Sequence, residues 1–150
     1  MDEQVVGKVG YVPGGFDMFH IGHLNILRAA RARCDHLVVG VATDESLLAM
    51  KGRPPVVPHV ERMEILANVR FVDAVVPDLS SDKRVAWHAN PFDVLFKGTD
   101  WLGTPKGDRL EAELKEVGAE VIYLPYTPST SSTMLRAFLT DALATPAGQV

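Results

Sequence analysis

The sequence predicts an α/β fold in which one parallel sheet is covered by helices on both faces. Short runs of apolar and β-branched residues alternate along the chain with segments of helical periodicity. These runs are almost continuously apolar, as in strands buried on both faces. The chain has 150 residues, 47% of them hydrophobic, enough for one sizeable core. We therefore expect a single doubly wound domain whose strands are Lys8–Val12, His36–Val41, Ala74–Val76, Phe92–Lys97 and Glu120–Leu124.

Helical periodicity recurs between and after these runs. Apolar residues three and four positions apart form one face of each segment, which is typical of a helix packed on a sheet. The residues after the last such segment are rich in Ala, Thr, Pro and Gly, so we expect a domain over 1–139 and a flexible tail over 140–150. The expected helices are Ile21–Arg33, Val60–Asn68, Arg84–Ala89, Asp108–Val117 and Ser132–Thr140.

Composition excludes several classes of function. The formal net charge is -4, with both signs interspersed, which predicts neither nucleic-acid binding nor a membrane-surface patch. The longest apolar stretches fall well short of the roughly 18 residues that a membrane span requires, so we expect no membrane insertion. The acidic start Met1–Gln4 lacks the pattern of a secretory signal, and the single Cys34, expected as a small buried hydrophobe, cannot form an internal disulfide. These features favour the reducing cytoplasm.

The segment after the first expected strand carries the strongest chemical signal. Gly14 and Gly15 allow a ligand to approach the main chain closely, and the helix start behind them offers free N–H groups to an anion. His20 and His23 lie three residues apart in the first helical turn, on one face, and Gly22 between them leaves that face uncrowded. The pattern predicts a site for phosphate groups.

Two simpler interpretations of the histidines are weaker. Polar residues at a helix start need no ligand, but that interpretation leaves the surrounding glycines unexplained. A zinc site needs a third and a fourth ligand, and the spacing of His36, His59 and His88 does not provide them.

The stretch Gly14–His23 resembles Gly-x-Phe-Asp-x-x-His-x-Gly-His, the signature of the cytidylyltransferases that activate glycerol 3-phosphate, phosphocholine and phosphoethanolamine. The resemblance implies a Rossmann-like nucleotidyltransferase fold and transfer of CMP from CTP to a small alcohol phosphate, glycerol 3-phosphate leading, with release of pyrophosphate. It also implies Mg²⁺ with the nucleotide, and a homodimer. Further blocks match in order over residues 8 to 138: Thr43–Glu45, Lys51–Gly52, Glu61–Arg62, Arg70–Asp73, Lys97–Trp101 and Ser131–Thr133.

The resemblance also implies roles for individual residues. His20 and His23 stabilise the transition state, and Lys51, in a mobile Gly/Pro-rich segment, closes over the phosphates. Asp17, Trp101 and Arg70 contact the acceptor. The residues implied in nucleotide binding are Gly14, Gly15, Phe16, Arg62, Asp100, Thr130, Ser131, Ser132 and Thr133.

Ordinary structural roles stay open for several of these residues. Lys51 suits a solvated loop, and Trp101 suits a cap on the core. Arg70 suits an ion pair with Asp73 at a helix-to-strand junction. A helix N-cap explains one hydroxyl of the motif 130–133, but not three in a row.

Two positions depart from the family pattern and keep alternatives open. Tyr126 stands where the family has an arginine that contacts the nucleotide, and Gly15 stands where the glycerol-phosphate enzymes have threonine. The stretch Lys97-Gly98 before Thr99 resembles the sequence of the heptose-phosphate adenylyltransferases. The alternatives are therefore an adenylyltransferase for a sugar phosphate such as heptose 1-phosphate, and a nucleotide-binding regulator without turnover. Class I aminoacyl-tRNA synthetases share His-Ile-Gly-His, but they need a larger body and a Lys-Met-Ser-Lys-Ser loop that this chain lacks.

Overall fold

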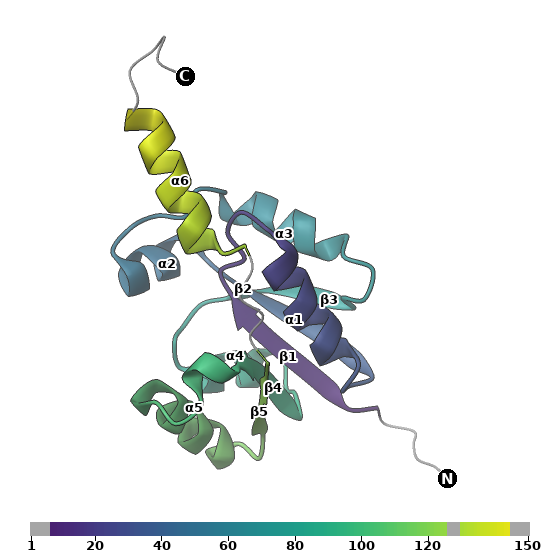
Figure 1. Ribbon diagram of the computed structural model, residues 1–150. Helices are drawn as coiled ribbons and strands as arrows, with labels where there is room; N and C mark the ends of the chain where they lie inside the picture. Colours follow the sequence, from purple (N-terminus) through teal and green to yellow (C-terminus); the bar gives the residue numbers. More distant parts are fainter. Residues whose placement is uncertain (1–6, 126–129, 145–150) are drawn as a thin grey trace.

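The computed structural model describes residues 7–125 and 130–144. Its core is one parallel sheet with the strand order β3-β2-β1-β4-β5 (Figure 1). The order reverses between β1 and β4, and in sheets of this kind ligands bind beside such a reversal, at the carboxyl ends of the strands. The strands are β1 (Val9–Gly14), β2 (His36–Ala42), β3 (Ala74–Asp78), β4 (Val94–Gly98) and β5 (Glu120–Leu124).

Helices cover both faces of the sheet, which confirms the predicted fold class. α1 (Ile21–Arg31) and α3 (His59–Ala67) pack on one face, while α4 (Lys83–Ala89) and α5 (Pro105–Glu116) pack on the other (Figure 1). Neighbouring residues of a strand point to opposite faces of the sheet. In β1, Val12 packs in the hydrophobic cluster with α1 and α3, and Tyr11 packs in the cluster with α4 and α5. Strands buried in this way need apolar residues at nearly every position.

One helix beyond the predictions positions the site. α2 (Asp44–Lys51) begins at the N-cap Thr43, whose hydroxyl accepts from the Ser46 N–H at 3.1 Å. It ends at Gly52, whose φ of 75° gives the left-handed cap that glycine adopts most easily. Lys51, predicted within a Gly/Pro-rich loop, is instead the last residue of this capped helix, and the Gly/Pro-rich segment follows it.

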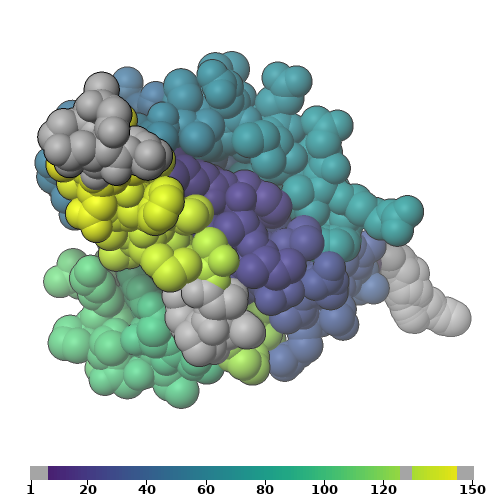
Figure 2. Space-filling model, turned by 45° about the horizontal axis from the view of Figure 1, so that its top comes forward, coloured from purple at the N-terminus to yellow at the C-terminus, as the bar shows by residue number. Residues whose placement is uncertain are grey.

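The C-terminal helix α6 (Ser132–Ala144) is longer than predicted. Residues 140–144, expected in a flexible tail, are helical, and the remainder of that tail lies outside the described residues. α6 lies on the surface between α1 and the side of the molecule that carries α4 and α5 (Figure 2). Cys34, expected as a small buried hydrophobe, follows α1 and is partly buried. In the described part of the chain, no helix has the length and apolarity to cross a membrane.

Candidate functional site

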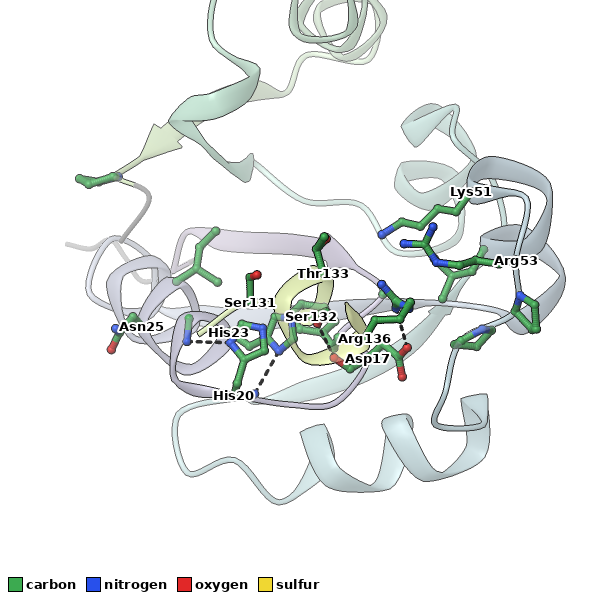
Figure 3. Close-up of a pocket in the computed structure, with 18 residues that line it drawn as sticks. Asp17, His20, His23, Asn25, Lys51, Arg53, Ser131, Ser132, Thr133 and Arg136 are labelled. Carbon is green, nitrogen blue, oxygen red and sulfur yellow. Dashed lines mark hydrogen bonds and ion pairs between the residues drawn. The ribbon is translucent and has the colours of Figure 1, made fainter. Parts of the chain in front are cut away.

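A cavity of about 290 Å³ opens at the carboxyl end of β1. We call it the histidine pocket, because His20 and His23 form one side of it (Figure 3). The start of α6, Ser131–Thr133, lies next to the histidines, and Lys51 and Arg53 reach in from the opposite side. Segments far apart in the sequence therefore converge on one small volume.

A second cavity, of about 740 Å³, adjoins the first. We call it the lysine pocket, because Lys83, Lys97 and Lys106 line it together with Arg109. The two cavities share Lys51. Of the other residues predicted in the first loop, Gly14 borders the lysine pocket, Phe16 the histidine pocket and Gly15 both.

Backbone contacts fix the orientation of both imidazoles. His20 is the N-cap of α1, and its Nδ1 accepts from the Gly22 N–H at 3.0 Å. Nδ1 of His23 accepts from the His20 N–H at 3.3 Å. Because both Nδ1 atoms are acceptors, each neutral ring carries its proton on Nε2. The rings stack with centroids 3.8 Å apart, and a side chain at Gly22 would meet the His20 ring at 2.8 Å.

Both histidines are held neutral. Burial lowers the pKa of His20, and burial together with the nearby His20 lowers the pKa of His23 to about 3. The rings of Phe16 and Phe19, with centroids 5.3 and 5.5 Å from that of His23, provide much of the apolar environment. At neutral pH the pair therefore presents two N–H donors without net charge.

Asp17 connects the first loop of the histidine pocket to two other segments by hydrogen bonds. It lies between Phe16 and Met18, whose φ angles of 55° and 52° are in the left-handed region, where a non-glycine residue costs about 1 kcal/mol or more. Its carboxylate accepts from the N–H groups of Val56 and Val57, both at 2.8 Å, and from Arg136 at 3.0 Å. Burial raises the pKa of Asp17, but these hydrogen bonds outweigh it and leave the pKa below its usual value.

The structure gives Asp17 a role beside the predicted acceptor contact, which stays a prediction. Its carboxylate holds three hydrogen bonds within the chain and so positions the loop around residue 56 against α6.

Arg62 also differs from its prediction. Its side chain is fully buried, and it donates to the carbonyl oxygens of Val57, Gly15 and Ala42 at 2.7–2.8 Å. It also pairs with the Asp44 carboxylate at 2.7 Å. A guanidinium with these contacts has no free face for a nucleotide, so Arg62 acts as an internal clamp that fixes the Gly15 carbonyl.

The three hydroxyls at the start of α6 have three different environments. Ser131 Oγ accepts from the Met134 N–H at 3.0 Å, an ordinary N-cap contact, and Ser132 Oγ donates to the Asp17 carbonyl at 2.6 Å. Within the described residues, Thr133 Oγ1 has no hydrogen-bond partner and lies in the histidine pocket. Thr130 is not among the lining residues, and Ser131 Oγ only accepts in the part of the chain that the structure describes, so the hydroxyl groups of Thr133 and Ser131 can both donate to a ligand.

Arg136 is a pocket residue that the sequence analysis missed. It lies four residues after Ser132, on the same face of α6, so helical spacing from the predicted motif could have found it. Its Nε is buried and has no partner among the described residues, although Nη2 pairs with Asp17. Repulsion from Arg136 and Arg53 adds to burial in lowering the pKa of Lys51, so this part of the pocket is electropositive.

Part of the lysine pocket is lined by a buried carboxylate that is held by hydrogen bonds. The Asp78 carboxylate accepts from the Tyr11 hydroxyl at 2.6 Å and from Lys83 Nζ at 2.7 Å. Burial, together with Asp78, raises the pKa of Tyr11, so the phenol stays protonated. Lys97 Nζ lies 4.0 Å from the centre of the Trp101 ring, which places the predicted Trp101 at the pocket and not only over the core.

Besides Arg62 and Thr130, two further predicted residues lie outside both pockets. Arg70 is exposed and precedes the amino end of β3, so the predicted acceptor contact is corrected, because the pockets lie at the carboxyl ends. Its expected partner Asp73 instead pairs with Arg31 at 3.4 Å and accepts from the Leu37 N–H at 2.7 Å. Asp100 is exposed and lines neither cavity. Tyr126 lies outside the described residues.

The chemistry of the donors does not fit a metal held by the protein. Among residues 7–125 and 130–144, no group of three or more His, Cys, Asp or Glu is placed to bind a metal ion. The carboxylate in the histidine pocket, Asp17, is occupied by its three donors, and oxygen ligands are what Mg²⁺ requires.

Comparisons with known proteins place the chain among related sequences. A family model described as cytidylyltransferase-like matches residues 11–138. Ethanolamine-phosphate cytidylyltransferase from Arabidopsis thaliana is 41% identical over 113 residues, 72% of this chain and 27% of that protein. The bifunctional protein HldE of Streptomyces coelicolor is 41% identical over 134 residues, 87% of this chain and 28% of that protein. FAD synthase from Pyrococcus horikoshii is 40% identical over 128 residues, 79% of this chain and 82% of that protein.

The chain thus spans about a quarter of the length of the first two relatives and most of the third. Among solved structures, a lipopolysaccharide core biosynthesis protein from Thermoplasma volcanium has a TM-score of 0.69 at 20% identity, covering 83% of this chain and 100% of that one, which supports the fold. The matched model covers most of the chain, including both pockets, and the chain therefore belongs to the cytidylyltransferase-like family.

Proposed function

We propose that this chain is a nucleotidyltransferase that moves CMP from CTP to a small phosphorylated alcohol and releases pyrophosphate. The observation that carries the proposal is the neutral His20–His23 pair beside the start of α6, in a pocket that opens across Lys51 into a second, cationic cavity. Oriented N–H donors and a helix N-terminus suit the phosphates of a nucleotide. The adjoining cavity suits the acceptor.

The reaction needs positioning more than it needs proton transfer. A phosphate oxygen of the acceptor attacks the α-phosphorus, the bond from that phosphorus to the oxygen bridging the β-phosphorus breaks, and its electron pair leaves with pyrophosphate. A phosphate dianion carries no proton on the attacking oxygen, so no general base and no protein nucleophile are required. The Nε2–H groups of His20 and His23 donate to the phosphoryl oxygens as negative charge develops.

The remaining residues of the histidine pocket bind the rest of the triphosphate. Thr133 supplies a free hydroxyl, and Lys51 and Arg53 supply positive charge from the opposite side. Because Lys51 borders both cavities, we propose that it binds the oxygen atoms nearest the α-phosphorus.

Mg²⁺ enters the proposal only as a counter-ion of the nucleotide. Magnesium commonly keeps water and substrate phosphate oxygens as ligands, and that mode needs no carboxylate cage. Loss of turnover in EDTA, restored by added Mg²⁺, is the expected result. A homodimer, also implied by the family resemblance, is checked by light scattering on the purified protein.

A second candidate is adenylyl transfer to a sugar phosphate or a larger phosphate ester. The FAD synthase relatives favour it, because FAD contains an adenylate and this chain spans 82% of the Pyrococcus horikoshii protein. A regulator that binds nucleotide without turnover is a third candidate. The correctly oriented pair of neutral histidines is the observation against it.

The deciding experiment is pyrophosphate release with Mg²⁺, in which CTP and ATP are each combined with glycerol 3-phosphate, phosphoethanolamine, phosphocholine and heptose 1-phosphate. Turnover with CTP and an alcohol phosphate is the expected result. Turnover with ATP alone would replace cytidylyl by adenylyl transfer. Nucleotide binding without pyrophosphate release from any combination would contradict the proposal and favour the regulator.

A further inference from the structure

The lysine pocket holds more positive charge than one acceptor phosphate requires. Three carboxylates line it, and all three have cationic partners: Asp78 pairs with Lys83 at 2.7 Å, while Asp82 and Glu113 pair with Arg84 at 2.7 and 3.8 Å. Four cationic side chains that line it form no ion pair within the described residues, namely Lys51, Lys97, Lys106 and Arg109. Lys51 borders the histidine pocket and is assigned to the reacting phosphates.

Two of the other three cations lie beside one indole, and the third, Arg109, lines the same cavity. Lys97 Nζ lies 4.0 Å and Lys106 Nζ 5.7 Å from the centre of the Trp101 ring. Contact with an aromatic face stabilises each cation but leaves its charge in place. Lys106 and Arg109 are three residues apart on α5 and so share a face. Lys106 lies in the first turn of that helix, where the helix dipole disfavours a cation.

Lys97 is the least exposed of these three cations, so its charge is not fully stabilised by solvent. It is partly buried at the end of β4, and loss of solvation, with repulsion from Lys83 and Lys51, lowers its pKa to about 8 in spite of nearby Asp100 and Asp78. A partly buried lysine without an ion-pair partner is stabilised by an anion that binds beside it.

We propose that the acceptor carries a second anionic group besides the phosphate that attacks, and that Lys97, Lys106 and Arg109 bind this group beside Trp101. The inference rests on the proposed function and narrows the acceptor to a phosphorylated acid, such as a carboxylate-bearing polyol phosphate. A cationic acceptor such as phosphoethanolamine would place its ammonium group next to these three cations, and the repulsion between like charges disfavours its binding.

Matched pairs of acceptors test the inference. 3-Phosphoglycerate differs from glycerol 3-phosphate, and 6-phosphogluconate from glucitol 6-phosphate, by a carboxylate in place of a hydroxymethyl group. We expect kcat/KM, from pyrophosphate release, to be at least about tenfold higher for the acid of one pair or both, as for one added charge-assisted hydrogen bond. In Lys106→Gln and Arg109→Gln the preference should fall several-fold, whereas Lys115→Gln, at the far end of α5, should keep it.

Binding measurements separate this inference from the proposed function. Calorimetry with protein saturated with α,β-methylene-CTP, which cannot be cleaved between the α- and β-phosphorus atoms, reports acceptor affinity without turnover. At pH 8 the acid should bind with net proton uptake, because a bound anion raises the pKa of Lys97, and Lys97→Met should abolish the uptake. Tighter acid binding without pyrophosphate release would sink the enzymatic proposal and leave the anion site standing. Equal affinity within both pairs, or variants that weaken the nucleotide instead of the acceptor, would overturn the inference.

Discussion

The histidine pocket and the lysine pocket share Lys51 but are built in opposite ways. In the histidine pocket, polar groups are oriented by bonds within the chain, and its two central donors are neutral at pH 7. In the lysine pocket, several cations have no ion-pair partner among the described residues, and one of them, Lys97, is partly buried. Under the proposed function, reaction and recognition are separated: oriented neutral donors bind the transferred nucleotidyl group, and net positive charge binds the acceptor.

We expect the largest effect at Arg62, which fixes the carbonyl oxygen of Gly15, a residue that borders both pockets. Arg62→Met leaves three carbonyl oxygens and the Asp44 carboxylate without their donor, and we expect it to lower the free energy of unfolding by about 3–5 kcal/mol. Urea denaturation measures this loss, with Arg33→Met, an exposed arginine after α1, as the control. A loss below about 1 kcal/mol for Arg62→Met would show that the clamp is dispensable.

The histidine pair tests whether geometry serves the chemistry. His20→Ala and His23→Ala each remove one oriented donor, so kcat should fall about 10²–10³-fold in each variant. Circular dichroism checks that the fold is kept, and His88→Ala, an exposed histidine on α4, should retain full turnover. Near-normal turnover in either pocket variant would contradict the assigned role.

The lowered pKa of His23 makes stability depend on pH in a definite direction. Because the unfolded state binds a proton below pH 6.5 that the folded state rejects down to about pH 3, stability should fall as the pH falls through this window. Between pH 6.5 and pH 5 the loss due to His23 is about 2 kcal/mol. Urea midpoints of the wild type and of His23→Asn, measured at both pH values, check it. A slope that is identical in the two proteins would remove His23 as its source.

Much of the fold could be predicted from the sequence, because its strands are buried on both faces and read as apolar runs. β5 lies where the prediction placed it, and the other strands differ by at most two residues at either end. α2 was missed although its cap signals are present in Thr43 and Gly52, because eight residues with two adjacent leucines show weak helical periodicity. Glycine and proline after Lys51 favoured a loop instead.

The site was less predictable, because its contacts join distant segments. His20, His23 and Gly22 form one local motif, and the structure places them as a local motif predicts. The four partners of Arg62 come from three separate segments, around residues 15, 42–44 and 57, so a family block alone suggested a phosphate contact where there is an internal clamp. The unpaired cations of the lysine pocket follow β4 or lie on α5, and nothing in their spacing marks them as one group.

The central claim is direct in-line transfer from the histidine pocket to an acceptor bound across Lys51, without a covalent enzyme intermediate. The stereochemical course at the α-phosphorus tests it most directly, using the Sp isomer of CTP with sulfur on that phosphorus and an accepted phosphate ester. The account predicts inversion of configuration in the product, as a single displacement requires. Retention would require two displacements, and so a nucleophile in the protein, and would contradict the account.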